Sequence, residues 1–421
     1  MTATSRTETW DPPERPDWAE RINEEGSYMD IRGVVPLDEA SLLATAERNT
    51  GLSDYGADHW REPFRHLVAS YDNEARLNLM GRLRVRSDLL IWLEARLAIE
   101  DTYRRHPEIA DETIVEPMVI VGQGRSGTSA MINLLSAHPD NGCVRTWEAM
   151  FPCPPPEKAT YFTDPRIDKA DKLIQQWNRV VPRIEALHEY TGIIPTECIQ
   201  ALNISFMGYN WLNAIAPVPG YSAYAVRQSM VPALTDYKRL LKLLQWRNPR
   251  QRWVLKAPSH LSWLPDLVEV FPDARFIWTH RDPLKAMASV VNLIGSMQWC
   301  STDHPFGDGT LVLYTDSTMV AGLLNNAIDW LEETKLPPDR ICNLQFKDFV
   351  DDRIAGVKQV YDTFGFELTD EGLAAMQRYV DDNPRGKRKP NVYSIGPEDQ
   401  VAYERKAFER YQRYFDVPDE S

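Results

Sequence analysis

The sequence has 421 residues, of which 43% are hydrophobic and 26% are charged. This composition is typical of a globular protein with one large α/β core or two modest domains. A net charge of −14 argues against general affinity for nucleic acids or anionic membranes. The N-terminus is polar, and no apolar run reaches the ~18 residues that span a bilayer, so we expect a cytoplasmic protein with no transmembrane segment.

The five cysteines predict neither a metal site nor a disulfide framework. They show no CxxC spacing and no pairing with histidines, which are the patterns of zinc sites and disulfide-bonded domains. A reducing compartment fits this usage, and we expect no metal. The cysteines are Cys143, Cys153, Cys198, Cys300 and Cys342.

The chain divides into three parts by pattern. Residues 1–36 are rich in proline and charge and predict a loose or surface-draped arm, whereas residues 37–106 carry apolar residues at helical spacing. We therefore predict an N-terminal arm and helical extension over residues 1–115, an α/β domain over residues 116–395, and a C-terminal helix over residues 396–421.

Residues 118–136 predict a strand, a glycine-rich turn and a helix. The backbone N–H groups of such a turn, with the positive end of the helix behind it, bind anions such as phosphate. In a nucleotide triphosphate-binding loop a lysine would stand where this chain has Thr128, and the cation of the turn is instead Arg125. The turn therefore favours a monophosphate or a mixed anhydride over ATP.

Three later segments, residues 252–256, 275–280 and 340–346, read as strands that are each followed by a helix. Alternating strands and helices predict a parallel sheet flanked by helices, whose ligands gather at the carboxyl ends of the strands. Lys256 and Arg281 lie at or just beyond such ends, as does Gly124 in the turn.

The region between residues 147 and 224 is rich in aromatic residues. Residues 167–190 predict a helix bent at Pro182, and residues 196–213 predict another helix. Aromatic side chains of this region, among them Tyr221 and Tyr224, either line an apolar pocket or fill the core, and the sequence leaves both interpretations open.

Two motifs resemble those of the sulfotransferases that use 3′-phosphoadenylyl sulfate (PAPS). The sequence GRSGTS, from Gly124 to Ser129, is similar to the arginine-bearing form of that family's 5′-phosphosulfate loop. Arg281 at a strand end, with Ser289 eight positions later, is similar to the family's 3′-phosphate motif. Many members place a tryptophan after the loop to stack on adenine, whereas this chain has Ala130.

A third segment and two shorter ones extend the resemblance. Arg385, Gly386 and Lys387 are similar to the basic loop that closes over the same 3′-phosphate. The segments Trp-Glu-x-x-Phe-Pro at 147–152 and Leu-Lys-x-Pro-x-His at 255–260 resemble a bacterial branch of the family. The motifs occur in the family's order across residues 118–393.

The resemblance implies a P-loop NTPase-like parallel sheet, which is the sulfotransferase fold. It implies in-line transfer of the sulfuryl group from PAPS, a co-substrate, to a hydroxyl group, with 3′,5′-phosphoadenosine (PAP) as product and no metal. Arg125 would stabilise the charge that grows on the bridging oxygen, and Lys256 would steady the sulfonate. The residues implied to bind the donor are Gly124, Arg125, Ser126, Gly127, Thr128, Ser129, Arg281, Ser289, Arg385, Gly386 and Lys387.

The acceptor hydroxyl needs a base, and the sequence offers two. We favour Glu148, because its segment follows the loop helix and because sulfotransferases that the chain resembles often use a glutamate. His260 is the rival, since other branches of the family use a histidine. Both are therefore candidate catalytic residues, with Arg125 and Lys256.

Two other functions remain open at this level: an atypical P-loop kinase or NTPase, and a nucleotide-binding scaffold without catalysis. For a transferase, the aromatic content favours a small apolar alcohol or phenol as acceptor, with no nucleic-acid partner. A homo-oligomer is possible.

Overall fold

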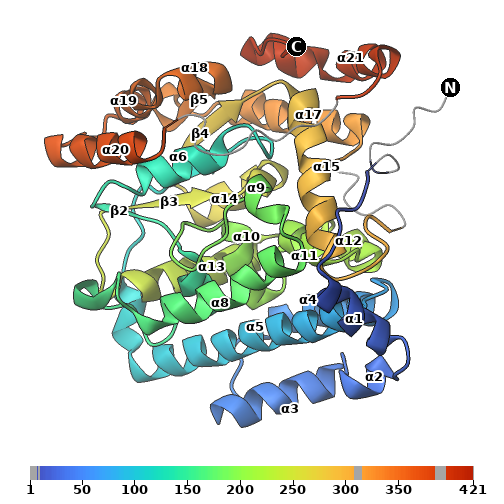
Figure 1. The fold of residues 1–421 in the computed structure, drawn as a ribbon. Coiled ribbons are helices and arrows are strands. Elements are labelled where there is room, and N and C mark those ends of the chain that lie inside the picture. Colours follow the sequence, from blue (N-terminus) through green and yellow to red (C-terminus); the bar gives the residue numbers. More distant parts are fainter. Residues whose placement is uncertain (1–6, 8–9, 308–314, 385–394, 421) are drawn as a thin grey trace.

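The structure is a computed structural model that describes residue 7 and residues 10–307, 315–384 and 395–420. At its centre is a sheet of five parallel strands in the order β2-β3-β1-β4-β5 (Figure 1). The predicted strands are all present, and β2 is an additional short edge strand, so the α/β fold with a parallel sheet is confirmed. The strands are β1 (Met118–Val121), β2 (Asn141–Gly142), β3 (Arg252–Lys256), β4 (Arg275–His280) and β5 (Ile341–Gln345).

Different helices cover the two faces of the sheet. Alternate side chains of a strand point to opposite faces, so a strand can contribute residues to both apolar layers. Met118 and Ile120 of β1 pack in one apolar cluster with α6 (Thr128–Leu135), α19 (Arg353–Phe364) and α20 (Asp370–Asp382). Val119 and Val121 belong to a larger cluster on the other face. All four side chains are fully buried, so β1 is the centre of the α/β core.

The remaining helices of this part connect the strands or follow β5. They are α7 (Thr146–Met150), α8 (Pro165–Val180), α9 (Ile184–Leu187), α10 (Cys198–Ala201), α11 (Tyr209–Ile215), α12 (Pro219–Ala225), α13 (Val231–Gln245), α14 (Leu264–Val270), α15 (Pro283–Trp299), α17 (Ser317–Thr334), α18 (Phe346–Asp351) and α21 (Glu398–Phe415). Short 3₁₀ turns η1 to η6 lie at Asp58–Trp60, Pro107–Asp111, Lys158–Thr160, Leu202–Ser205, Pro258–Ser262 and Pro338–Arg340. Within the described ranges, every helix is too short or too polar to cross a bilayer.

The helix predicted over residues 196–213 is interrupted. It consists of α10, the turn η4 and α11, and the break falls at Phe206, whose φ is +53°. At Gly208 a Cβ atom would lie 2.2 Å from the carbonyl oxygen of Ile199, so the chain folds back on itself there. Tertiary packing explains the break, because the Phe206 ring is buried against Trp60 and Phe64 at centroid distances of 5.8 and 4.8 Å.

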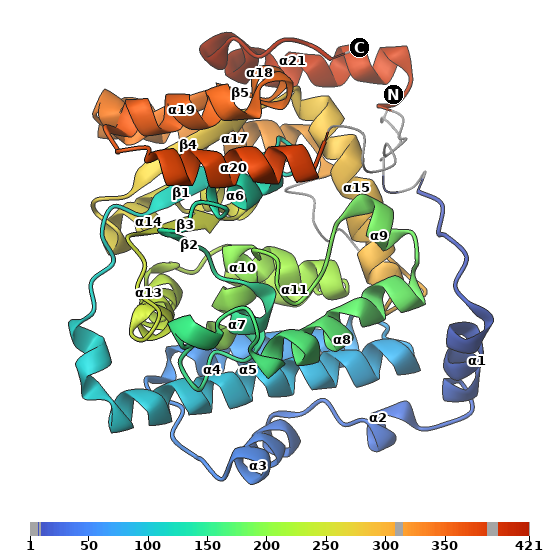
Figure 2. The same cartoon turned by 60° about the vertical axis from the view of Figure 1, so that its left-hand side comes forward.

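The N-terminal extension is helical, as predicted, and packs against the α/β part. The longest of its helices, α5, runs below α8 and α13 in both views, with α3 on its other side (Figures 1 and 2). One apolar cluster contains residues of these helices and of the sheet, so the extension shares a core with the sheet. Its helices are α1 (Asp17–Gly26), α2 (Ile31–Val34), α3 (Glu39–Thr50), α4 (Arg61–Asn73) and α5 (Leu79–Arg105).

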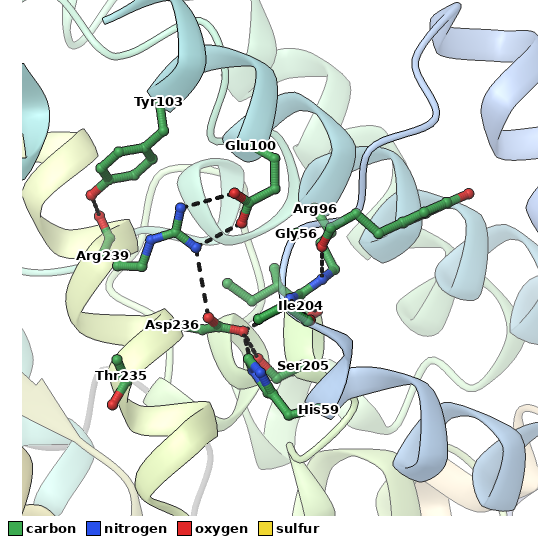
Figure 3. A network of polar contacts seen from close by, with 12 residues as sticks. Gly56, His59, Arg96, Glu100, Tyr103, Ile204, Ser205, Thr235, Asp236 and Arg239 are labelled. Atoms are coloured by element: carbon green, nitrogen blue, oxygen red, sulfur yellow. Dashed lines mark hydrogen bonds and ion pairs between the residues drawn. The ribbon is translucent and has the colours of Figure 1, made fainter. Parts of the chain in front are cut away.

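A buried polar network joins the extension to α13 (Figure 3). The Asp236 carboxylate accepts hydrogen bonds from Arg96 Nη1 at 2.7 Å, His59 Nε2 at 2.8 Å and Ser205 Oγ at 2.7 Å. Burial would raise the pKa of Asp236, but the hydrogen bond from His59 and the charge of Arg96 outweigh it and hold the pKa below its usual value. Arg96 also donates to the carbonyl oxygens of Tyr55 and Ala57 from elsewhere in the extension.

We expect Arg96→Met to lower the free energy of unfolding by about 3–5 kcal/mol, because removing one partner leaves the Asp236 charge buried with less compensation. Urea denaturation measures this change. Arg104→Met on the same helix removes an exposed ion pair with Asp101 and is the control, with an expected loss below about 1 kcal/mol. Equal losses in the two variants would show that the network contributes no special stability.

Candidate active site

A cavity of about 370 Å³ opens at the carboxyl edge of the sheet. It is lined by the turn after β1, by Lys256 at the end of β3, by Arg281 after β4 and by Phe346 after β5. Residues 186–200 and α15 form much of the remaining wall. The position agrees with the general rule that ligands of open parallel sheets bind beyond the carboxyl ends of the strands.

The glycine-rich turn adopts a backbone shape that depends on its glycines. Gly122 and Gly127 have φ values of +143° and +96°, which disfavour residues with side chains. A Cβ atom at Gly127 would also lie only 3.0 Å from the Phe346 ring. Gly127 caps α6, so the first amides of this helix, which have no acceptor within it, begin at the cavity wall formed by Thr128 and Ser129. Amides of a helix start beside a cavity are the groups that bind anions in many proteins, and anion binding by this turn stays a prediction.

Ser126 is absent from the cavity wall, and its expected contact with the donor stays a prediction. Its hydroxyl donates to the carbonyl oxygen of Gln123 at 2.6 Å and lies 2.8 Å from Thr279 Oγ1 on β4. The backbone N–H of Ser126 also donates to Gln123. Because the residue is fully buried, its role is to hold the turn against the sheet.

The structure brings Arg125 of the glycine-rich turn together with Arg281 and Ser289, which the sequence placed in a second motif. Arg125 Nε donates to Ser289 Oγ at 3.0 Å, and Arg281 Nη1 donates to the carbonyl oxygen of Arg125 at 3.0 Å. The Arg281 guanidinium also lies 4.2 Å from the ring centroid of Phe346 and contacts the carboxylate of Glu420. The two arginines therefore form one cationic end of the cavity. The predicted donor-binding residues Arg385, Gly386 and Lys387 lie outside the described residues.

Lys256 lies beside a glutamate that the sequence analysis missed. Its Nζ is 2.6 Å from Glu197 Oε1 and 3.2 Å from Ser129 Oγ. Only 3% of the Lys256 side chain is exposed, against 22% for Glu197, and both residues line the cavity. The ammonium thus links an acidic group to the anion-binding turn. Glu197 occupies the N-cap position of α10. In the sequence it is only an acidic residue before an apolar helix, a pattern that is common at helix starts without catalytic function.

Glu148 lies outside the cavity, which counts against the base that the sequence favoured. It is buried in α7, where its Oε2 accepts a hydrogen bond from the backbone N–H of Arg145 at 2.8 Å in a capping box. Burial raises the pKa of Glu148, and the bond from Arg145 opposes that rise. Of residues 146–152, only Thr146 lines the cavity. Helix capping explains this glutamate at the third helical position.

His260 is also absent from the cavity wall. It is fully buried, and its Nδ1 accepts a hydrogen bond from Trp263 Nε1 at 2.9 Å. Burial, with a smaller contribution from the charge of Lys256, lowers the pKa of His260 to about 3. The placement is that of a neutral core histidine.

A different histidine, His188, lines the cavity. Its ring stacks on Tyr190 at a centroid distance of 4.4 Å. Burial and then the charge of Lys256 lower the pKa of His188 to about 4, so the imidazole is neutral near pH 7. No motif in the sequence pointed to it, because it follows the short helix α9 in a segment predicted as one bent helix.

Much of the remaining cavity wall is apolar. Tyr190 and Trp211 meet edge to face at 5.9 Å, and aliphatic side chains from α9 and α15 continue the wall. Tyr221 and Tyr224, by contrast, are outside it: the hydroxyl of Tyr221 donates to the carbonyl oxygen of Phe206 in the core, and Tyr224 stacks on His66. Aliphatic residues of the wall include Leu187, Ile194, Ile199, Leu293, Ile294 and Met297.

Comparison with known proteins finds two related sulfotransferases. They are the omega-hydroxy-beta-dihydromenaquinone-9 sulfotransferases Stf3 of Mycobacterium bovis and Mycobacterium tuberculosis, each 24% identical to this chain over 317 residues. The matches cover 73% of this chain and 77% of each relative.

Solved structures match over a still larger part. Sulfotransferase STF1 from Mycobacterium tuberculosis H37Rv is 28% identical with a TM-score of 0.75, over 89% of this chain and 98% of its own. Sulfotransferase STF9 from Mycobacterium avium is 27% identical with a TM-score of 0.76, over 90% and 97%. Residues 117–370 match the model of the sulfotransferase family, and with this match over more than half of its length the chain belongs to that family.

Proposed function

We propose that this sulfotransferase moves the sulfuryl group of PAPS to the hydroxyl of an apolar acceptor. The observation that carries the proposal is that Arg125, Lys256 and Arg281 line one cavity, together with apolar residues such as Trp211 and Met297. Because the whole chain carries a charge of −14, three cations at one sheet edge are a local feature that suits a doubly phosphorylated donor. The same charge supports the absence of a nucleic-acid partner, and we propose a cytoplasmic location.

The two ends of the donor would meet different parts of the cationic end. Arg281 and Ser289 would hold the 3′-phosphate, which distinguishes PAPS from ATP. The cavity-lining residues of the turn, which are Gly124, Arg125 and Gly127 to Ser129, would hold the 5′-phosphosulfate with their amides and the Ser129 hydroxyl. Arg385 and Lys387 are proposed to complete the 3′-phosphate site.

Transfer requires stabilisation of charge on the leaving oxygen and removal of a proton from the acceptor. Arg125 and Lys256 supply positive charge where the S–O bond to the 5′-phosphate breaks. The acceptor oxygen attacks sulfur, and its proton passes to a carboxylate, leaving PAP and the sulfate ester. We propose Glu197 as this base in place of Glu148, because Glu197 lines the cavity 2.6 Å from the Lys256 ammonium.

The acceptor is proposed to be a small or extended apolar molecule with a free hydroxyl or phenol. The apolar wall around Trp211, Tyr190 and Met297 supports this class. The Stf3 relatives act on omega-hydroxy-beta-dihydromenaquinone-9, as their names state, and the likeness supports an acceptor of similar chemistry for this chain.

Binding of nucleotides separates sulfuryl transfer from kinase or NTPase activity. We expect isothermal titration calorimetry to show PAP binding at least ~10-fold tighter than ATP, without dependence on Mg²⁺, because the turn has Thr128 where ATP-binding loops have a lysine. Tight ATP binding that requires Mg²⁺ would favour the kinase function.

Replacing Arg125 tests the role of the turn. We expect Arg125→Ala to lower kcat with PAPS by about 10²–10³-fold, because one preorganised donor of positive charge is lost from the transition state. Thermal unfolding should change little, since Arg125 is only partly buried and its Nε donates to Ser289 at the cavity rather than into the core. Near-normal turnover in a folded variant would rule out the proposed role.

Two isosteric changes decide between the candidate bases. We expect Glu197→Gln to lower kcat by about 10²–10⁴-fold while PAP affinity stays nearly unchanged. Glu148→Gln keeps an acceptor for the backbone N–H of Arg145 and should retain most activity. The measurement is turnover of labelled PAPS against a panel of apolar alcohols and phenols. Loss of activity in Glu148→Gln alone would restore the sequence-based assignment.

His188→Gln belongs in the same panel, because this histidine is another cavity-lining group that is able to accept a proton. A loss of kcat in His188→Gln that equals or exceeds the loss in Glu197→Gln would transfer the role of base to the imidazole. We expect the smaller effect at His188.

A further inference from the structure

The segment after α21 folds back onto the carboxyl edge of the sheet. Asp416 ends the helix with a φ of +52°, and the backbone N–H of Val417 donates to the carbonyl oxygen of Gln412 at 2.9 Å. The side chain of Val417 is 5% exposed, and Asp419 accepts from Gln412 Nε2 at 2.8 Å. Residues 416–420 are therefore held in a defined path by the last turns of α21 (Figure 1).

This path ends at the cationic end of the cavity. Glu420 Oε1 and Oε2 accept hydrogen bonds from Arg281 Nε and Nη2, each at 2.8 Å, which is a two-point carboxylate–guanidinium pair. The backbone N–H of Glu420 donates to Asp282 Oδ2 at 2.8 Å. Arg405 of α21 reaches the same Asp282 oxygen at 3.1 Å and also pairs with Asp419. Both the side chain and the backbone N–H of Glu420 thus have hydrogen-bond partners within the chain.

The contact uses the edge of Arg281 that a phosphate would use. A guanidinium binds phosphate and carboxylate through the same pair of parallel N–H groups, and here that pair is Nε and Nη2. Arg281 Nη1 already donates to the carbonyl oxygen of Arg125. A phosphate at the Nε and Nη2 edge therefore requires the Glu420 carboxylate to leave.

We infer that Glu420 is an intramolecular competitor for the 3′-phosphate of the donor at Arg281. The inference rests on the proposed function, because it takes PAPS and PAP as the ligands. Donor binding displaces the carboxylate from Arg281, and release of PAP allows the carboxylate to return. Since only the fraction of molecules with a displaced carboxylate binds tightly, the apparent affinity for 3′-phosphorylated nucleotides is lower than Arg281 would give alone.

The test compares two nucleotides in two kinds of variant by titration calorimetry at fixed ionic strength. We expect Glu420→Gln and Glu420→Ala to bind PAP about threefold to tenfold tighter than the unaltered protein, the size expected for loss of one partly exposed ion pair. Adenosine 5′-monophosphate has no 3′-phosphate, so its dissociation constant should stay unchanged in both variants.

Glu409→Gln is the matched control, because it removes the same charge from an exposed position of α21. It should leave both dissociation constants unchanged, which separates competition at Arg281 from a general effect of net charge. The competition is overturned if the Glu420 variants bind PAP no better than the unaltered protein does, or if the gain is equal for adenosine 5′-monophosphate. If the unaltered protein still prefers PAP over adenosine 5′-monophosphate, the proposed function stands even when the competition by Glu420 is disproved. If neither the unaltered protein nor any variant prefers PAP, both the competition and the proposed function are wrong.

Discussion

The site depends above all on the parallel pairing of β1 with β3 and β4. Parallel strands end at the same edge, so the register that pairs Ile120 with Lys256 and Ile277 also brings the turn after β1, Lys256 and Arg281 to one place. The fully buried side chains of β1 fix this register, since a slip by one residue would exchange the two faces of the sheet. The geometry of the charges is thus a consequence of apolar packing.

Two of the cations at this edge have carboxylate partners in the described structure. Lys256 pairs with Glu197, and Arg281 pairs with Glu420. Unbalanced buried charges are costly, so such partners stabilise the arrangement in the absence of substrate. The two carboxylates differ in their position relative to the proposed ligands: Glu197 lies where an acceptor would sit, whereas Glu420 lies where a donor phosphate would sit.

Sequence patterns predicted the sheet and the turn well because both rest on local signals. Four strands lie where the sequence patterns placed them, and the positive φ angles at Gly122 and Gly127 explain why the turn contains glycine. The patterns failed where a residue type has several uses. Glu148 matched the position of a catalytic glutamate, but in the structure it caps a helix. Glu197 had only the pattern of a residue at a helix start, but it lines the cavity. The contact of Glu420 with Arg281 spans 139 positions, and no periodicity in the sequence predicts it.

The two ends of the cavity are carried by different kinds of chain segment. The cationic end is carried by the turn after β1, by Lys256 at the end of β3 and by Arg281 after β4, whereas Glu197, Tyr190 and Trp211 belong to the long helical connection between β2 and β3. Changes to the apolar residues of that connection, with Glu197 kept, would alter the wall proposed to meet the acceptor while the residues proposed to bind the nucleotide stay in place. One fold is thereby able to accept different molecules in different proteins, because the segment between β2 and β3 can vary independently of the sheet.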